Sequence, residues 1–205
     1  MNIHSLYRPF LKYFRTKRMQ QFQRWFKVSS ETQILDAGGD LFNWSLLEEP
    51  AQVVFLNLYA AERDGCSWVV ADSCHLPFGD EAFDIVYSNS VIEHLGNLWH
   101  QQETAEEIRR VGRRYYVQTP NRHFFVEPHL LTPFIHYFPK AIRRHLLRNF
   151  TIWGLITRPT AIQCKAFIEE VRLLNEKEFE MLFPDAEIWQ ERALGFSKSL
   201  IAVKF

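Results

Sequence analysis

Short apolar runs alternate with amphipathic stretches through most of the chain after about residue 30. Five of these runs are rich in β-branched or aromatic residues, as buried strands are. They lie at 33–36, 52–58, 68–71, 83–88 and 115–118. Helical patterns fit between them, at 43–49, about 60–64, 91–95 and 101–111. Short strands that alternate with helices predict a mostly parallel sheet with helices on both faces.

The last thirty residues follow a different pattern. A helix is predicted over 175–183, with Asn175 as its N-cap and Glu178 three residues later. Two further strand patterns, at 186–194 and 198–205, flank the sequence Gly-Phe-Ser. A short loop that contains glycine is typical of a hairpin, so we expect the sheet to end in an antiparallel strand.

Two segments differ from the rest of the chain in their charge. Residues 1–30 carry seven basic and no acidic side chains, with aromatic residues at helical spacing such as Phe22 and Phe26. Residues 122–165 carry seven basic residues and one acid, Glu127, and are also rich in rings. We therefore predict a basic aromatic helical segment at 1–30, followed by a domain at 31–205 with a basic helical insertion at about 122–165.

Composition narrows the class of protein. The chain has 205 residues, of which 47% are hydrophobic and 23% charged, as in one globular domain. Its three cysteines lack the spacing of a metal site and are too few for a disulfide framework, so we expect reduced thiols and no metal ion. No uninterrupted apolar stretch is long enough for a signal peptide or a membrane span, which favours a cytoplasmic location.

Small and polar residues follow the first two predicted strands. Gly38 and Gly39 allow a tight turn and a close approach of the backbone to a ligand, although a plain turn is the alternative. The motif G-x-G-x-x-G is absent, which argues against a dinucleotide pyrophosphate site. Asn57 ends the second strand, where a polar side chain of a nucleotide-binding fold meets ribose hydroxyls.

The third and fourth strands frame the run ADSCHLPFGDEAFDIVYSNSVIEHL, residues 71–95. This run resembles the signature of class I S-adenosylmethionine-dependent methyltransferases, in which an Asp is followed by Leu-Pro-Phe, an acid, Phe-Asp, a strand and Glu-His. The sequence ILDAGG at 34–39 resembles the first glycine motif of that family, and the hairpin at 186–205 resembles its last strands. YYVQTPNRHFFVEPH, at 115–129, resembles a subgroup of bacterial members. The resemblance covers about 31–130 and 170–205.

The resemblance implies a fold, a cofactor and an activity. The expected fold is α/β, a Rossmann-like doubly wound sheet of seven strands that is mostly parallel, with an antiparallel C-terminal strand and helical lid segments from both basic regions. The expected reaction transfers a methyl group from S-adenosylmethionine to an O, N or C nucleophile of a small-molecule, saccharide or lipid acceptor. The residues that would bind the cofactor are Asp36, Gly38, Gly39, Asn57, Asp72, Ser73, Ser88 and Asn89.

The resemblance also implies a role for several of these residues. Asp36 would hold the amino group of the cofactor, Asp72 would accept from the adenine amino group beside the Ser73 backbone, and Ser88 and Asn89 would lie near the sulfonium methyl. The chain departs from the family pattern in two places. Its first motif has one glycine fewer than usual, and Asn57 replaces an acid.

Candidate groups for the acceptor side follow the fourth and fifth strands. His94 is the first candidate for a general base, because its unperturbed pKa lies near ~6.5; the alternative is a packing histidine. Asn121, Glu127 and His129 lie past the fifth strand, on the side where ligands bind in such sheets. Their alternative roles are a turn and an anchor for the insertion.

Other functions stay open at this stage. A catalytically silent binding module would explain the missing glycine and Asn57, whereas the absence of G-x-G-x-x-G disfavours a nicotinamide-dependent oxidoreductase. The basic segments suit a lid over the site, attraction of an anionic acceptor, or docking on the inner face of an anionic membrane. Nucleic acid ranks below these partners, because no nucleic-acid-binding motif is present.

Overall fold

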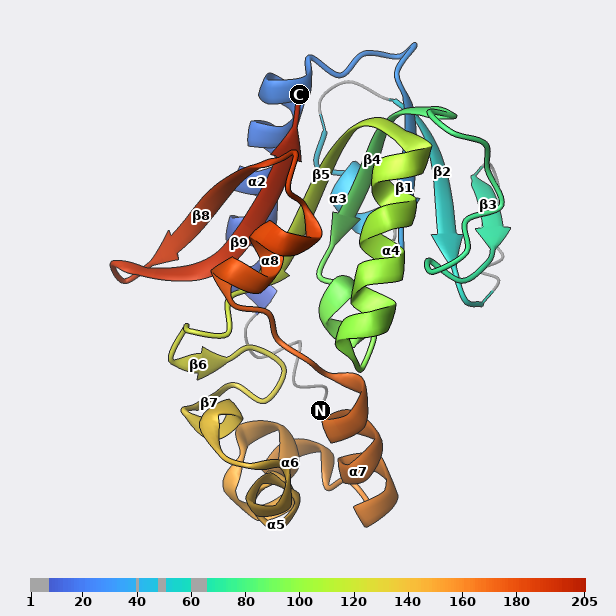
Figure 1. Ribbon diagram of the computed structural model, residues 1–205. Coiled ribbons are helices and arrows are strands. Elements are labelled where there is room, and N and C mark those ends of the chain that lie inside the picture. The colour runs from blue at the N-terminus through green and yellow to red at the C-terminus, as the bar shows by residue number, and fades with distance from the viewer. Residues whose placement is uncertain (1–7, 40, 48–50, 60–65) are drawn as a thin grey trace.

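The computed structural model describes residues 8–39, 41–47, 51–59 and 66–205 (Figure 1). Its centre is a seven-stranded sheet with the order β3-β2-β1-β4-β5-β9-β8. The strands of this sheet are β1 (Gln33–Ala37), β2 (Gln52–Asn57), β3 (Ser67–Val70), β4 (Phe83–Asn89), β5 (Gly112–Pro120), β8 (Glu187–Ala193) and β9 (Phe196–Lys204). The first five run parallel, and β9 pairs antiparallel with both β5 and β8. The predicted fold class is thus confirmed.

Helices cover both faces of the sheet, as Figure 1 shows. The helical elements are α2 (Arg8–Phe26), α3 (Leu41–Trp44), η1 (Ile92–His94), α4 (Leu98–Val111), η2 (Ile135–Tyr137), α5 (Lys140–Phe150), α6 (Ile152–Thr157), α7 (Ala161–Glu170) and α8 (Glu176–Leu182). Because side chains alternate along a strand, neighbouring residues enter different cores. Leu35 packs with Ile108 of α4 and Phe179 of α8, whereas Ile34 packs with Phe22 of α2.

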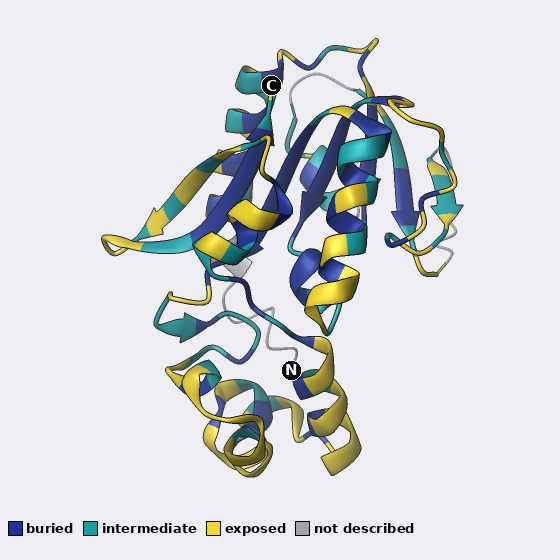
Figure 2. Cartoon of the chain, in the orientation of Figure 1, coloured by how far each residue is buried: buried dark blue, intermediate teal, exposed yellow. Residues whose placement is uncertain are grey.

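The N-terminal helix differs from the expected lid. Helix α2 lies against the sheet, whose central strands are coloured as buried in Figure 2, and Met19, Phe22 and Phe26 are buried in the core between them. The Phe22 ring lies 5.1 Å from the Tyr87 ring and 5.5 Å from the Tyr116 ring, centroid to centroid. These buried side chains of α2 therefore fill a layer of the domain, whereas Tyr13, Lys17 and Arg24 are exposed.

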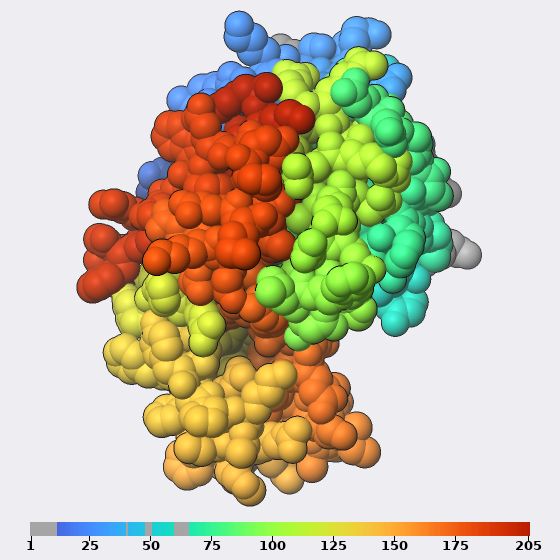
Figure 3. Space-filling model, viewed as in Figure 1, coloured from blue at the N-terminus to red at the C-terminus, as the bar shows by residue number. Residues whose placement is uncertain are grey.

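The insertion forms a small lobe beyond the carboxyl ends of β4 and β5. It contains a two-stranded ribbon of β6 (Val126–Glu127) and β7 (Thr132–Pro133), followed by α5, α6 and α7. Its own core includes Leu130, Ile135, Leu147, Cys164 and Ile168. A neck joins this lobe to the sheet domain (Figure 3). The lobe runs to the end of α7, five residues past the predicted boundary.

Several predicted element boundaries were wrong. The helix expected at 43–49 is the short α3, Leu41–Trp44, and the helix expected at 91–95 is the single 3-10 turn η1. The helix expected at about 60–64 lies outside the described residues. No helix in the described ranges has both the length and the apolar character needed to cross a membrane.

Candidate functional site

The predicted cofactor residues follow neighbouring parallel strands and share one edge of the sheet. The Gly38 amide donates to the Leu56 carbonyl at 2.8 Å, and the Ala71 amide donates to the Asn57 carbonyl at 3.1 Å. The buried Ser88 hydroxyl donates to the Ala37 carbonyl at 3.2 Å. These bonds hold the carboxyl ends of β1, β2, β3 and β4 together, at the place where ligands bind in open α/β sheets.

The turn after β1 requires both of its glycines. Gly38 has a φ of +91°, and a Cβ there would lie 2.7 Å from the Val91 side chain. A Cβ at Gly39 would lie 1.9 Å from Oδ2 of Asp36. The Asp36 carboxylate is fully buried and accepts a hydrogen bond from Nε1 of Trp44 at 2.6 Å. The backbone of this turn thus passes directly over a buried carboxyl group.

Asn57 and Asp72 shape the neighbouring loops. Nδ2 of Asn57 donates to the Gly39 carbonyl at 3.0 Å, so this amide ties the end of β2 to the glycine turn. The exposed Asp72 accepts from the Cys74 amide at 3.0 Å, and the Ser73 hydroxyl lies 3.2 Å from the Thr104 hydroxyl. An amide at position 57 therefore donates to a carbonyl that a carboxylate would repel.

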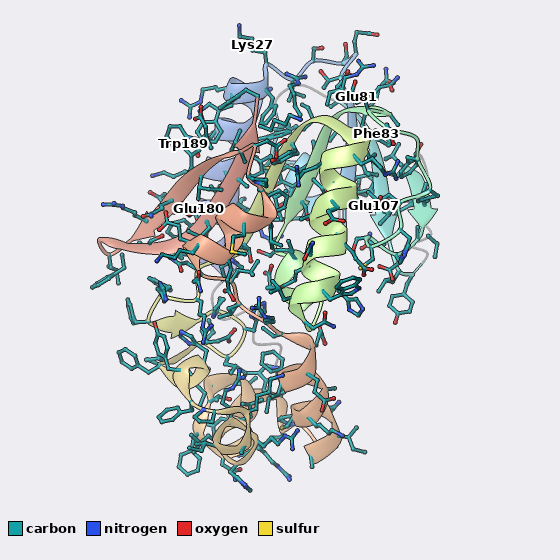
Figure 4. The ribbon with its side chains drawn as sticks, in the orientation of Figure 1. Lys27, Glu81, Phe83, Glu107, Glu180 and Trp189 are labelled. Carbon is teal, nitrogen blue, oxygen red and sulfur yellow. The ribbon has the colours of Figure 1, made fainter. Side chains whose placement is uncertain are left out.

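The Leu-Pro-Phe and Phe-Asp parts of the signature support the fold. Helix α4 holds the Leu-Pro-Phe loop through Glu107 (Figure 4), which accepts from the Leu76 amide at 2.6 Å. Arg110 bonds Glu107 and donates to the carbonyls of Leu76 and Phe78. Its hydrogen bond lowers the pKa of Glu107. The Asp84 carboxylate accepts from the Gln33 amide at 3.0 Å and so joins β4 to the start of β1.

A buried arginine from α2 reaches the end of β4. Arg18 donates to Oδ1 of Asn89 and to Oε1 of Gln118, the latter at 2.6 Å. Its Nε also lies 3.1 Å from a carboxylate oxygen of Glu191 on β8. Sequence reasoning did not find this residue, because nothing in the sequence separates it from the other six basic residues of the segment.

A second cluster of side chains lies where η1 meets the insertion. Nδ1 of His94 is 2.8 Å from Glu170, and Nδ1 of His129 is 2.7 Å from Glu127. The two rings meet edge to face, 4.8 Å apart between centroids, beside the fully buried Glu93. Three predicted site residues, His94, Glu127 and His129, are thus brought together. Glu93 was missed as a site residue, although it belongs to the Glu-His pair of the signature.

Burial and hydrogen bonding shift two pKa values in this cluster. Burial raises the pKa of Glu93. Burial lowers the pKa of His129, but the hydrogen bond and the charge of Glu127 outweigh that effect and leave the His129 pKa raised. Asn121 belongs to the loop after β5, where its side-chain oxygen accepts from the His123 backbone amide and its NH₂ group donates to the Ser197 hydroxyl.

A basic cavity of about 360 Å³ adjoins this cluster. Its basic lining residues are Arg122, His136, Lys140, Arg143 and Arg172. Glu127 also lines the cavity. Among the described residues, Nε of Arg143 is buried without a hydrogen-bond partner, and burial lowers the pKa of this guanidinium. Gly38, Asn57, Asp72 and Ser88 line none of the four principal cavities of the described part.

The strand order, the glycine turn and the shared carboxyl edge define a class I methyltransferase fold. A family model described as a methyltransferase domain matches residues 45–114. No curated protein sequence matches the chain. The chain therefore has the fold of class I methyltransferases, and its residues 45–114 resemble the methyltransferase-domain family.

Solved structures with low sequence identity share this fold. The YcgJ protein of Bacillus subtilis is 14% identical with a TM-score of 0.53, over 85% of this chain and 70% of its own. A SAM-dependent methyltransferase of Methanosarcina mazei is 14% identical with a TM-score of 0.51, over 86% and 92%. The magnesium protoporphyrin IX methyltransferase of Synechocystis, solved with bound SAM, is 10% identical with a TM-score of 0.51, over 93% and 79%.

Proposed function

We propose that this protein binds S-adenosylmethionine at the carboxyl ends of β1 to β4 and transfers its methyl group to an acceptor with an anionic group. The glycine turn over Asp36 carries the first part of this proposal, because a side chain at either Gly38 or Gly39 would collide with its surroundings. The basic cavity beside His94 and His129 carries the second part.

The residues at this edge carry groups that complement those of the cofactor. Asp36 offers a buried carboxylate for a cationic amino group, and the exposed Asp72 offers an acceptor at the end of β3. Asn57 uses its NH₂ group on the Gly39 carbonyl, which leaves its oxygen to accept from a ribose hydroxyl. These three side chains and the two glycines are the groups that we assign to cofactor binding, with Ser73, Ser88 and Asn89 beside them.

Methyl transfer requires the protein to align the two reactants more than to activate them. The cofactor supplies an electrophilic methyl group on its sulfonium, so the chain must place the nucleophile in line and exclude water. A nucleophile that carries a proton also needs a base. His94 is our candidate, because Glu170 occupies its Nδ1 and leaves Nε2 to accept the proton.

The basic cavity favours an acceptor with a phosphate or carboxylate group. Arg122, Lys140 and Arg143 line it, and Nε of Arg143 has no partner within the described ranges. A buried guanidinium donor without a partner is costly, and an anion that enters the cavity would satisfy it. Saccharide and lipid acceptors that carry such a group belong to this class.

Calorimetric titration with S-adenosylmethionine and S-adenosylhomocysteine tests the cofactor site. We expect micromolar binding that Asp72→Ala weakens at least tenfold, or about 1.4 kcal/mol. Asp80→Ala is the matched control, because Asp80 is an exposed acid eight residues away, and it should leave the dissociation constant within twofold. Absence of heat from folded wild-type protein would favour the catalytically silent binding module instead.

Titration with inorganic pyrophosphate tests the anion site separately. Arg143→Gln should weaken binding about tenfold, the worth of one charge-assisted hydrogen bond. Arg144→Gln is the matched control, since that side chain is 51% exposed and pairs with Glu169 at 3.8 Å. Equal affinities of the two variants would remove the argument for an anionic acceptor at this cavity.

A further inference from the structure

We propose that Glu93, His94 and His129 bind a divalent transition-metal ion of the Zn²⁺ type. Each of the three side chains offers one ligand atom, and these atoms all lie within 4.8 Å of one another. Two imidazoles and one carboxylate form a ligand set that suits Zn²⁺ and related first-row ions. Bonds of about 2.1 Å require small rotations of the side chains toward a common centre.

Both histidines have the hydrogen bond to a carboxylate that is typical of metal-bound histidines. Each uses Nδ1 on a carboxylate, His94 on Glu170 and His129 on Glu127. Such a bond favours the neutral tautomer with its proton on Nδ1, which leaves the Nε2 lone pair for a ligand bond. A carboxylate behind a metal-ligating histidine fixes the ring orientation and raises its basicity. Two such pairs therefore converge here from separate parts of the chain.

Glu93 supplies an independent observation. Its side chain is fully buried, and Thr119 donates to Oε2 at 3.1 Å. Its other oxygen, Oε1, has no hydrogen-bond partner among the described residues. A buried carboxylate oxygen without a partner is expensive, and a cation is the kind of ligand that compensates it.

The balance of charge points the same way. Three carboxylates, those of Glu93, Glu127 and Glu170, surround two imidazoles. Basic residues line the cavity that Glu127 also lines, and they offset part of this charge from that side. Glu93 is not among the residues of that cavity, and a divalent cation between the three ligand atoms would compensate its buried carboxylate.

The position of the cluster suggests a use for the ion. Glu127 supports His129 and also lines the basic cavity, so an ion at this cluster would lie next to a bound acceptor. It would attract an acceptor oxygen and favour loss of its proton. This role of the ion in methyl transfer rests on the proposed function, whereas the proposal that the cluster binds a metal ion does not. It also replaces the base role of His94, since one Nε2 cannot hold both a proton and the ion.

Metal titration of the full chain tests the site without any methyl transfer. Protein stripped with a chelator is titrated with Zn²⁺ by calorimetry and with Co²⁺ by visible absorption. We expect one ion per chain with micromolar or tighter affinity, and Co²⁺ bands typical of nitrogen ligation. Glu93→Gln and His129→Asn should each weaken Zn²⁺ binding at least a hundredfold. Failure of the wild-type protein to bind one equivalent would overturn the proposal.

Variants at exposed residues distinguish the loss of a metal ligand from misfolding of the protein. Glu170 is 53% exposed, so Glu170→Gln should fold normally and weaken Zn²⁺ binding about 10- to 100-fold through His94. His145→Asn removes an exposed histidine on α5 and should change nothing. Unaltered Zn²⁺ affinity in both Glu170→Gln and His129→Asn would contradict this ligand set. Titration with S-adenosylhomocysteine in parallel separates failure of the metal site from failure of the cofactor site.

Discussion

Arg18 anchors α2 to the carboxyl edge of the sheet, and its removal should destabilise the whole domain. Its side chain is 6% exposed and pairs with Glu191, whose side chain is 12% exposed. It also donates to Asn89 and Gln118. The change Arg18→Met keeps most of the apolar stem but removes every one of these contacts. It leaves a buried carboxylate and two amide oxygens short of a donor.

The magnitude follows from these partners. Removing one member of a buried ion pair costs about 3–5 kcal/mol, because the other charge stays buried. Lys198 lies 2.8 Å from the other oxygen of Glu191 and offsets part of that cost. We therefore expect a loss of about 3 kcal/mol in the free energy of unfolding. For a chain of this length the melting temperature should fall by about 6–12 °C.

Urea unfolding followed by circular dichroism measures this loss. The double variant Arg18→Met/Glu191→Gln should be more stable than the sum of the two single changes predicts, because the pair is coupled. The control Arg24→Met removes an exposed arginine of the same helix and should cost less than about 0.5 kcal/mol. If Arg18→Met also costs less than that, α2 is not anchored through this side chain.

Three further predictions follow from single contacts. Gly39→Ala should abolish binding of S-adenosylhomocysteine in calorimetry, since its Cβ would lie 1.9 Å from Asp36, whereas Gly79→Ala enters open space and should bind normally. Phe22→Ala should lower the free energy of unfolding in urea by about 3–5 kcal/mol, because the ring is fully buried. Glu107→Gln should cost about 2 kcal/mol at pH 7. The Arg110 hydrogen bond lowers the Glu107 pKa in the folded state, so its stabilisation is present above the ordinary pKa of 4.5 and is lost as pH falls through the folded value. Urea titrations of wild type and variant should therefore converge below pH 4.5.

The sheet was predictable because its pattern is local. The apolar runs of β1, β2 and β4 lie between turn residues, and the signature run fixes their order along the chain. The hairpin of β8 and β9 was predictable for the same reason, since Gly195 marks its turn. The packing of α2 was not predictable. The spacing of Phe22 and Phe26 defines an apolar face, but it does not say whether that face covers a sheet or a ligand.

Part of the candidate site was also predictable from the sequence, and part was not. The glycine turn and Asp72 could be placed from motif and strand order, because each follows a strand directly. The partners Arg18 and Glu191, 173 positions apart, come together only through the antiparallel addition of β9 and β8. Glu93 and Glu170 were not predicted as site residues, because their roles come from contacts between residues that are distant in the sequence. Glu93 contacts Thr119 of β5, and Glu170 of the insertion contacts His94.

The central claim is that S-adenosylmethionine binds where β1 to β4 end. Hydrogen exchange with and without S-adenosylhomocysteine tests it most directly, because amide protection reports location as well as binding. We predict slower exchange at 36–39, 71–74 and 88–90, with no change in α5 of the insertion. Binding that protects α5 or the β8–β9 hairpin and leaves the glycine turn unchanged would contradict the account.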